Sequence, residues 1–385
     1  IGYLLFPILV GLIIPYLLVG LMGAGSVMQG VTRGAFPDLF SSTGGAVPPW
    51  LTALVISCVV LYYIFAGGVR SAAWANTFQT VVFIIMGFIA FVTISSKLGG
   101  MQVASSMIDT AKTVRSGNIT ELQFFSYCLI PLSVGMFPHL FQNCLTAKSA
   151  RSFKLTLIAH PLAIMLTWIP CILIGLWATG AVMPDGGTPV IPEGASPNAV
   201  LGMMVGKLTT PIIGGLVTAG ILAAVMSSLD SQFVAVGTMF TKDIVVHGFG
   251  ADRFSEKQLV MLARGFICFI VLVTYLFTLV EPRQVFSLGI WCFSGFAGLF
   301  PLVFASIYWK RATKAGAYAG VIGGALMWLV LFQASGFGAD KEYSIGGTMP
   351  VVPIFFTCAI ALVVVSLFTS APSQTTLDKF FTKKS

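Results

Sequence analysis

The feature that constrains this chain most is a series of long apolar stretches separated by short polar segments. A helix needs about 20 mostly apolar residues to cross the hydrocarbon core of a bilayer. Barrel strands would alternate in polarity over about ten residues instead. We therefore predict an all-α polytopic membrane protein with ten transmembrane helices. The predicted spans are approximately Tyr3–Val31, Pro49–Ala66, Asn76–Leu98, Phe124–Leu145, Phe153–Val182, Pro211–Phe240, Val260–Val280, Val285–Trp309, Ala315–Phe332 and Val351–Thr369.

Composition agrees with a membrane protein and argues against several other classes. Only 9% of the residues are charged and 57% are hydrophobic, whereas a soluble domain carries about 25% charged residues. The net charge of +8 does not indicate nucleic-acid binding, because the basic residues lie in short loops between spans. The seven Cys residues form no CxxC or Cys/His cluster, so neither a metal site nor a disulfide framework is predicted. HExxH and GxSxG motifs are also absent, so no enzyme is predicted.

The distribution of Lys and Arg predicts the orientation in the membrane. The loops after the even-numbered spans, together with the C-terminal tail, hold 14 of the 21 basic residues. Cytoplasmic loops carry an excess of Lys and Arg, so this side should be cytoplasmic. An even number of spans then places both chain ends in the cytoplasm. We expect an integral protein of the cell (inner) membrane.

The sixth span contains an unusual group of polar residues, Ser227, Ser228 and Asp230. Hydroxyl oxygens suit a hard alkali cation, and a helix that loosens here could add the carbonyl of Ala224. This pattern is compatible with a sodium site. Alternatively, the two hydroxyls bond back to their own helix. An acid inside a span is a functional hypothesis by default, although Asp230 could instead pair with a basic residue near the cytoplasmic mouth.

The fourth span is interrupted by two prolines and a glycine within Pro131–Pro138, and His139 and Gln142 follow directly. Transporters often break helices near the midplane, where the freed backbone groups bind ions and substrate. A Pro-kinked, packed helix with a hydrogen-bonded His is the alternative interpretation. The residues themselves leave both possibilities open.

The segment between the second and third spans reads GGVRSAAWANTFQ, from Gly67 to Gln79. It resembles the Gly-Gly-x-x-x-x-x-Trp-Thr-Asp-x-x-Gln element of the sodium:solute symporter family. Asn76 stands where that element has an Asp that the resemblance implicates in cation coupling. Asn keeps the shape of this acid without its charge. Since many family members carry an acid at the position of Asp230, the resemblance makes Asn76 and Asp230 candidate coupling or gating residues.

Three other stretches resemble the same family, and all four occur in the family's order. FPHLFQNCLTAKSARSFK is similar to a segment of the monocarboxylate and pantothenate-like branches, with Asn143 in place of an Arg. AAVMSSLDSQ resembles the sodium helix, and PLVFASIYWKRATKAGA resembles a later family pattern. Together these motifs extend over nearly the whole chain.

The resemblance implies the inverted-repeat fold of the leucine transporter. Residues 1–385 would form a single transmembrane transporter domain. Residues 1–98 would end the first repeat, 121–310 would form the second, 315–370 would be peripheral helices and 371–385 a cytoplasmic tail. The chain starts at Ile1 without a Met or a signal-peptide pattern. This start agrees with what the resemblance implies, namely that the first core helices of the bundle are missing from this sequence.

The leading hypothesis is a cation-coupled secondary symporter of a small organic solute, working by alternating access. Na⁺ is the expected coupling ion, with H⁺ as the alternative. Because His139 could hydrogen-bond a carboxylate, the solute could be a monocarboxylate. The expected Na⁺ ligands are Ala224, Ser227 and Ser228, and the expected solute contacts are Phe137, His139 and Gln142.

A second hypothesis belongs to another class. The chain could be a transporter-like sensor, or a structural subunit that associates with a partner subunit in a membrane complex. The replacement of charged family residues by Asn76 and Asn143 motivates this alternative. Beyond such a subunit, the expected partners are the small organic solute, the coupling cation and the lipid bilayer.

Overall fold

The computed structural model describes residues 1–385 except 109, 116, 118, 146, 185–186, 281–283, 341 and 382–385, and it describes no side chain at 68–71 or 251. Every regular element among the described residues is helical, as predicted. The longer helices are α1 (Gly2–Val31), α2 (Pro49–Lys97), α4 (Glu121–Leu129), α5 (Pro138–Leu145), α6 (Phe153–Trp177), α8 (Pro211–Met239), α10 (Glu256–Leu279), α11 (Val285–Ala297), α12 (Phe300–Tyr308), α13 (Lys314–Ala334) and α14 (Val351–Phe368).

Shorter helices occupy the connections between these spans. The sequence did not predict α3 and α7, which lie on two of the longer loops. The shorter α-helices are α3 (Met101–Ser106), α7 (Val200–Leu208), α9 (His247–Phe249) and α15 (Gln374–Phe380). The 3₁₀ turns are η1 (Ser41–Thr43), η2 (Thr110–Lys112), η3 (Ile130–Met136), η4 (Ala150–Ser152), η5 (Pro197–Ala199) and η7 (Ala251–Arg253), and η6 (Phe240–Val246) is a π-helix.

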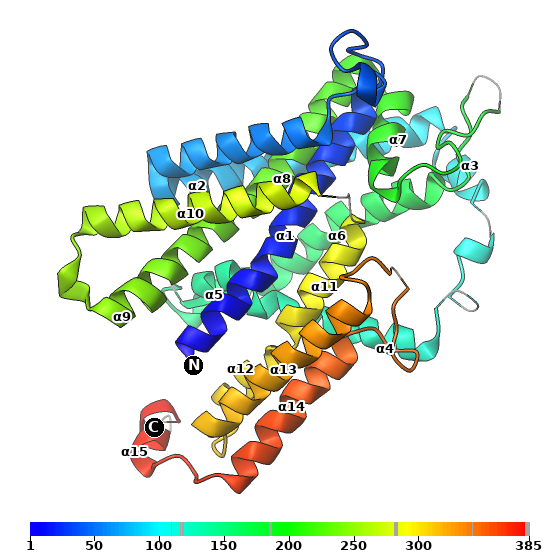
Figure 1. Ribbon diagram of the computed structural model, residues 1–385. Coiled ribbons are helices and arrows are strands. Elements are labelled where there is room, and N and C mark those ends of the chain that lie inside the picture. Colours follow the sequence, from blue (N-terminus) through cyan, green and yellow to red (C-terminus); the bar gives the residue numbers. More distant parts are fainter. Residues whose placement is uncertain are drawn as a thin grey trace.

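The number of spans agrees with the prediction. Nine helical segments of the described chain are long and apolar enough to cross a membrane, and a bent pair makes a tenth. Helix α2 supplies two of the nine, Pro49–Gly67 and Ala72–Lys97. Figure 1 shows these helices gathered into one bundle, with the N-terminus and the last described helix, α15, at the same end of it. The protein is therefore a polytopic membrane protein.

Helix α2 reverses direction between its two halves. Tyr63 in the first half and Asn76 in the second half donate to adjacent residues of α8, Asp230 and Ser231, although 13 residues of straight helix would separate them by about 20 Å. Both halves also pack along α8, and Figure 1 shows them as neighbouring ribbons. The turn predicted at Gly67, Gly68 and Arg70 falls largely on residues whose side chains are not described.

Of the two interpretations left open for the fourth span, the structure supports a break. Helix α4 gives way to the 3₁₀ segment η3, and α5 then starts at Pro138 with a bend of 53°. Proline lacks a backbone N–H donor, so Pro131 and Pro138 interrupt the hydrogen-bond ladder at both ends of η3. Pro138 suits the first position of α5, where no intrahelical donor is needed.

Two further irregularities were not predicted. The eighth span is divided at Gly298 and Leu299 into α11 and α12. The sixth span continues past α8 into the π-helix η6. π-helical turns are rare and are often found at functional sites. In this chain η6 carries Lys242 and Asp243 at the end of the bundle that holds the N-terminus.

A close helix contact fixes α7 against α1 at the other end of the bundle. The glycines Gly30 and Gly202 allow the two backbones to touch, because a Cβ at Gly202 would lie 2.6 Å from the carbonyl oxygen of Val27. Deeper in the bundle, the core forms where α1, α2, α8, α10 and α11 meet. Its fully buried side chains include Leu17, Leu21, Val60, Phe233 and Phe296.

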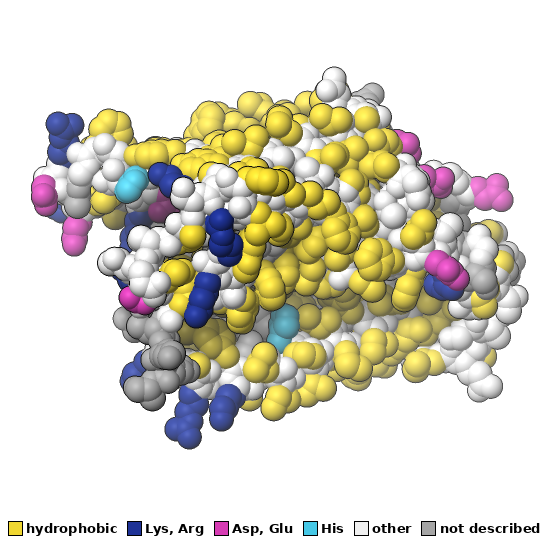
Figure 2. Space-filling view, turned by 90° about the horizontal axis from the view of Figure 1, so that it is seen from below, with side chains coloured by type: hydrophobic (Ala, Val, Ile, Leu, Met, Phe, Trp, Pro, Cys, Tyr) yellow, Lys and Arg dark blue, Asp and Glu magenta, His cyan; other side chains and the backbone are white. Residues whose placement is uncertain are grey.

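Charge is unevenly distributed along the bundle. Figure 2 shows a wide apolar belt, with the Lys and Arg side chains gathered mainly toward one end and acidic side chains at both ends. For five of the basic residues used in the orientation argument, the structure describes either nothing or no side chain. They are Arg70, Arg283, Lys341, Lys383 and Lys384.

Candidate cation and solute site

Asp230 is fully buried on α8 and is surrounded by neutral hydrogen-bonding groups. The hydroxyl of Tyr63, from the first half of α2, donates to its Oδ2 over 3.0 Å. The Oγ of Ser231 lies 3.2 Å from its Oδ1. Two neutral donors stabilise a carboxylate only partly, and an ionised group within a membrane costs several kcal/mol. The site is therefore suited to attract a cation or a proton.

The second half of α2 completes this group, which we call the Asp230 cluster (Tyr63, Asn76, Gln79, Asp230 and Ser231). Asn76 Nδ2 donates to Ser231 Oγ over 2.9 Å. The remaining amide oxygens, Asn76 Oδ1 and Gln79 Oε1, are buried and have no hydrogen-bond partner among the residues that the structure describes. Buried acceptors are nearly always paired, so two open carbonyl oxygens beside a buried acid need an explanation. A bound cation would satisfy both of them.

The chemistry of the Asp230 cluster favours a hard ion. Its available ligand atoms are oxygens, from a carboxylate, a phenol, a hydroxyl and two amides, and oxygen ligands select alkali and alkaline-earth cations. Within the part of the chain that was described, no three His, Cys, Asp or Glu residues come together as a metal site would require. One carboxylate among neutral oxygens is a ligand set that suits a monovalent cation.

The three predicted Na⁺ ligands lie one turn before this cluster on α8. Ser228 Oγ is 3.5 Å from the carbonyl oxygen of Ala224 and is exposed, whereas Ser227 is half-buried. The expected loosening of the helix is not present, because α8 is continuous from Pro211 to Met239. The Ala224 carbonyl therefore faces the Ser228 hydroxyl within an intact helix. Three neutral oxygens from one helix face provide only part of a coordination shell.

The predicted solute residues lie where α5 begins. Phe137 is buried in an aromatic cluster, stacked on Tyr16 of α1 at 5.0 Å between ring centroids and edge-on to Phe296 of α11 at 4.8 Å. The ring of His139 lies 5.7 Å from that of Phe137. Gln142 Nε2 donates to the carbonyl oxygen of Ala235 on α8 over 3.3 Å. The break of the fourth span is thus held against α1, α8 and α11.

A cavity of about 550 Å³ opens beside α5 at the end of the bundle that contains the chain termini. Gln142 lies in its wall, whereas Phe137 and His139 do not line it. Leu5 of α1 and Leu302 of α12 form apolar sides, and Lys242 and Asp243 of η6 add charge. Of the three predicted solute residues, the structure therefore places Gln142 on this cavity.

Sequence reasoning missed several residues that complete these sites. Tyr63 and Gln79 of the Asp230 cluster are polar side chains within or at the start of apolar spans, which was an available signal. Tyr16, which stacks on Phe137, and Phe296 carried no such signal, since aromatic residues are common in spanning helices. Contacts between distant spans decide which of these residues face the site.

Comparison with known proteins places the chain in a transporter family. The model of the sodium:solute symporter family matches residues 47–324. The sodium/proline symporter of Escherichia coli K12 is 28% identical over 361 residues, which cover 91% of this chain and 68% of that protein. The high-affinity proline transporter of Bacillus subtilis 168 is 25% identical over 336 residues, covering 85% and 67%.

The fold is also similar to that of a solved transporter. A Na⁺-coupled sialic acid symporter, solved in a substrate-bound outward-open state, superposes with a TM-score of 0.65 at 18% sequence identity. The match covers 94% of this chain and 75% of the solved one. At this identity the likeness concerns the fold, whereas the family match extends over most of the chain. The chain is therefore a member of the sodium:solute symporter family and a transporter rather than an enzyme.

Proposed function

We propose that this protein carries a small carboxylate-bearing solute across the membrane together with Na⁺, and that Asp230 is the residue that senses the cation. The single observation that carries this proposal is the Asp230 cluster. Among the described residues, its buried carboxylate meets neutral donors, beside two open amide oxygens. A cation bound at this point would contact α8 and both halves of α2 at once.

Ala224, Ser227 and Ser228 would supply a further set of oxygens for Na⁺ one turn along α8. Their neutral oxygens suit a hard cation, and the exposed Ser228 hydroxyl is open to a ligand. Asn76 contributes through Ser231, which lies between it and Asp230. We therefore assign the acidic role to Asp230, since Asn76 keeps the hydrogen bond without the charge. Protonation of Asp230 in place of Na⁺ binding is the alternative form of coupling.

The solute would bind beside the broken fourth span. Two relatives of this chain are named as proline transporters. Proline and monocarboxylates both carry a carboxylate, so this is the group that we expect the site to recognise. His139 and Gln142 offer hydrogen-bond donors to it, and the cavity next to Gln142 provides a path to one side of the membrane. Since bound Na⁺ would favour the solute-competent state, joint occupancy would permit alternating access.

The charge distribution supports an orientation with the basic end, and with it both chain ends, in the cytoplasm of a cell membrane. The alternative of a non-transporting sensor or structural subunit predicts no solute flux. It also predicts that the chain purifies with a stoichiometric partner.

Uptake into proteoliposomes of the full-length protein tests the proposal. Labelled proline, acetate and pyruvate are offered with an inward Na⁺ gradient, an inward H⁺ gradient or neither. We expect at least one of these solutes to accumulate only with the Na⁺ gradient. Uptake that depends on the H⁺ gradient alone would show that H⁺, and not Na⁺, is the coupling ion. No gradient-dependent uptake of any of the three would contradict carboxylate symport and favour the non-transporting alternative.

A further inference from the structure

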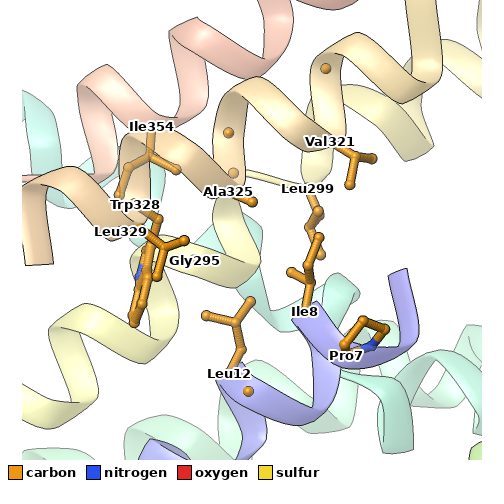
Figure 3. Close-up of a pocket in the computed structure, with 14 residues that line it drawn as sticks. Pro7, Ile8, Leu12, Gly295, Leu299, Val321, Ala325, Trp328, Leu329 and Ile354 are labelled. Carbon is orange, nitrogen blue, oxygen red and sulfur yellow. The ribbon is translucent and has the colours of Figure 1, made fainter. Parts of the chain in front are cut away.

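A second cavity lies outside the proposed transport site, between α1, α11, α13 and α14. Its volume is about 270 Å³. Figure 3 shows Ile8 and Leu12 of α1 facing Ala325 of α13 across it, with Leu299 between them. Trp328 and Ile354 lie toward one end, and Pro7 and Val321 lie toward the other. The helices α1 and α13 both run from the end at Pro7 and Val321 toward the end at Trp328 and Ile354.

The walls of this cavity are apolar. The one side-chain nitrogen among its lining residues is the indole Nε1 of Trp328, and it already donates to the carbonyl oxygen of Trp291 over 2.9 Å. A polar solute or a cation would lose its hydration here and gain no hydrogen bond in return. The lining of this cavity therefore favours an apolar occupant over the polar solute.

The cavity opens sideways rather than toward either end of the bundle. Pro7, Gly11 and Leu329 line it and are also exposed. Neighbouring residues of α13, such as Leu326 and Val330, are more than half exposed on the same apolar surface. On a spanning helix such residues face lipid. An acyl chain of the bilayer can therefore enter between α1 and α13.

The sequence around one end of the cavity carries positive charge. Lys310 and Lys314 are exposed, and Lys314 begins α13. Seven residues of helix, about 10 Å, separate Lys314 from Val321 at the cavity wall. No Asp or Glu occurs in residues 1–37 or 301–339, the segments that contain most of this wall. Basic residues at a membrane surface attract anionic lipid head groups.

We propose that this cavity binds one acyl chain of an anionic phospholipid whose head group rests on Lys314. The lipid wedges between α1, which also packs against α8, and the peripheral helix α13. Its site shares no residue with the Asp230 cluster, so the proposal does not depend on the transported solute.

Lipid retention measured by native mass spectrometry tests the proposal. The full-length protein is reconstituted into bilayers of equal parts phosphatidylglycerol and phosphatidylcholine and then released. We expect one retained phosphatidylglycerol per wild-type chain. Gly11→Leu and Ala325→Leu fill the cavity from opposite walls, and a Cβ at Gly11 would meet no atom within 4 Å. Each should lower retention about ten-fold or more, the loss expected when two buried methylenes no longer fit.

Matched controls separate the cavity from general effects. Gly23→Leu makes the same change on α1 at another open position outside the cavity and should retain lipid. Lys314→Gln should abolish the preference for phosphatidylglycerol over phosphatidylcholine, whereas Lys257→Gln, an exposed lysine on α10, should not. Equal retention in wild type and both filled variants would overturn the proposal, as would equal loss in Gly23→Leu.

A second measurement remains decisive if the filled variants do not fold. Phosphatidylglycerol with brominated acyl chains should quench tryptophan fluorescence in the wild type more than in Trp328→Phe. Equal quenching in the two would refute an acyl chain at this wall. A retained mass of a second chain or of a peptide, in place of a lipid, would show another occupant and refute the lipid assignment.

Discussion

Replacing Asp230 by Asn should separate two properties that usually change together, namely stability and cation response. The substitution keeps the shape of the side chain and removes the charge. In the wild type, Tyr63 at 3.0 Å and Ser231 at 3.2 Å hydrogen-bond to the carboxylate. Losing the charge at these two bonds costs about 2–3 kcal/mol in total. Relief from burying a charge returns several kcal/mol, so the Na⁺-free variant should be more stable by on the order of 1 kcal/mol.

The Na⁺ response should change in the opposite direction. Two unit charges 4 Å apart attract by about 4 kcal/mol at an effective dielectric constant of about 20. If the cost of stripping water from the ion cancels half of this, the loss of about 2 kcal/mol raises the half-saturating Na⁺ concentration by at least ten-fold. The wild-type thermal midpoint should rise with Na⁺, because a ligand that binds only the folded state stabilises it. The variant should show almost no rise.

Thermal unfolding in Na⁺ and in choline, together with Na⁺-dependent uptake, measures both effects. Asp252→Asn is the matched control, since this acid is exposed on η7, outside the Asp230 cluster and the cavity beside α5. An unchanged Na⁺ dependence in Asp230→Asn would refute the cation-sensing role. A large loss of stability without Na⁺ would refute the claim that the carboxylate is held only by neutral donors.

Three other substitutions test separate parts of the structure. Ser228→Ala removes one proposed Na⁺ oxygen and should raise the half-saturating Na⁺ concentration about ten-fold, whereas Ser306→Ala on α12 should not; equal uptake curves would exclude Ser228 as a ligand. Phe137→Ala should destabilise the protein by about 3–5 kcal/mol, since this ring is buried against Tyr16 and Phe296. If its unfolding midpoint falls no further than that of a variant with an exposed Phe replaced by Ala, the packing is contradicted. Gly202→Ala should lower the free energy of unfolding by about 1–3 kcal/mol, because its Cβ would collide with the Val27 carbonyl of α1. Chemical denaturation measures this loss with Gly23→Ala as the control, and equal stability of the two variants would contradict the close helix contact.

The sequence alone was sufficient for the spanning helices and for the position of an interruption in the fourth span, which the structure then showed to be a break. Both follow from local chemistry: a bilayer accepts long apolar helices with internally paired backbone groups, and Pro131 and Pro138 lack the donors that would continue a helix. The motif around Asn76 and the serines of the sixth span indicated the family before any contact was known. The expected repeat boundaries at 98, 121 and 310 stay a prediction.

The tertiary structure decided which polar groups meet. Asp230 and Asn76 are 154 positions apart in the sequence, and they come together through Ser231 because α2 reverses and both of its halves pack on α8. The same packing brings Tyr63 to the carboxylate and leaves two amide oxygens open. Such pairings depend on the rotation and depth of each helix within the bundle. Hydropathy along the chain cannot specify them, because in lipid every outward face is equally apolar.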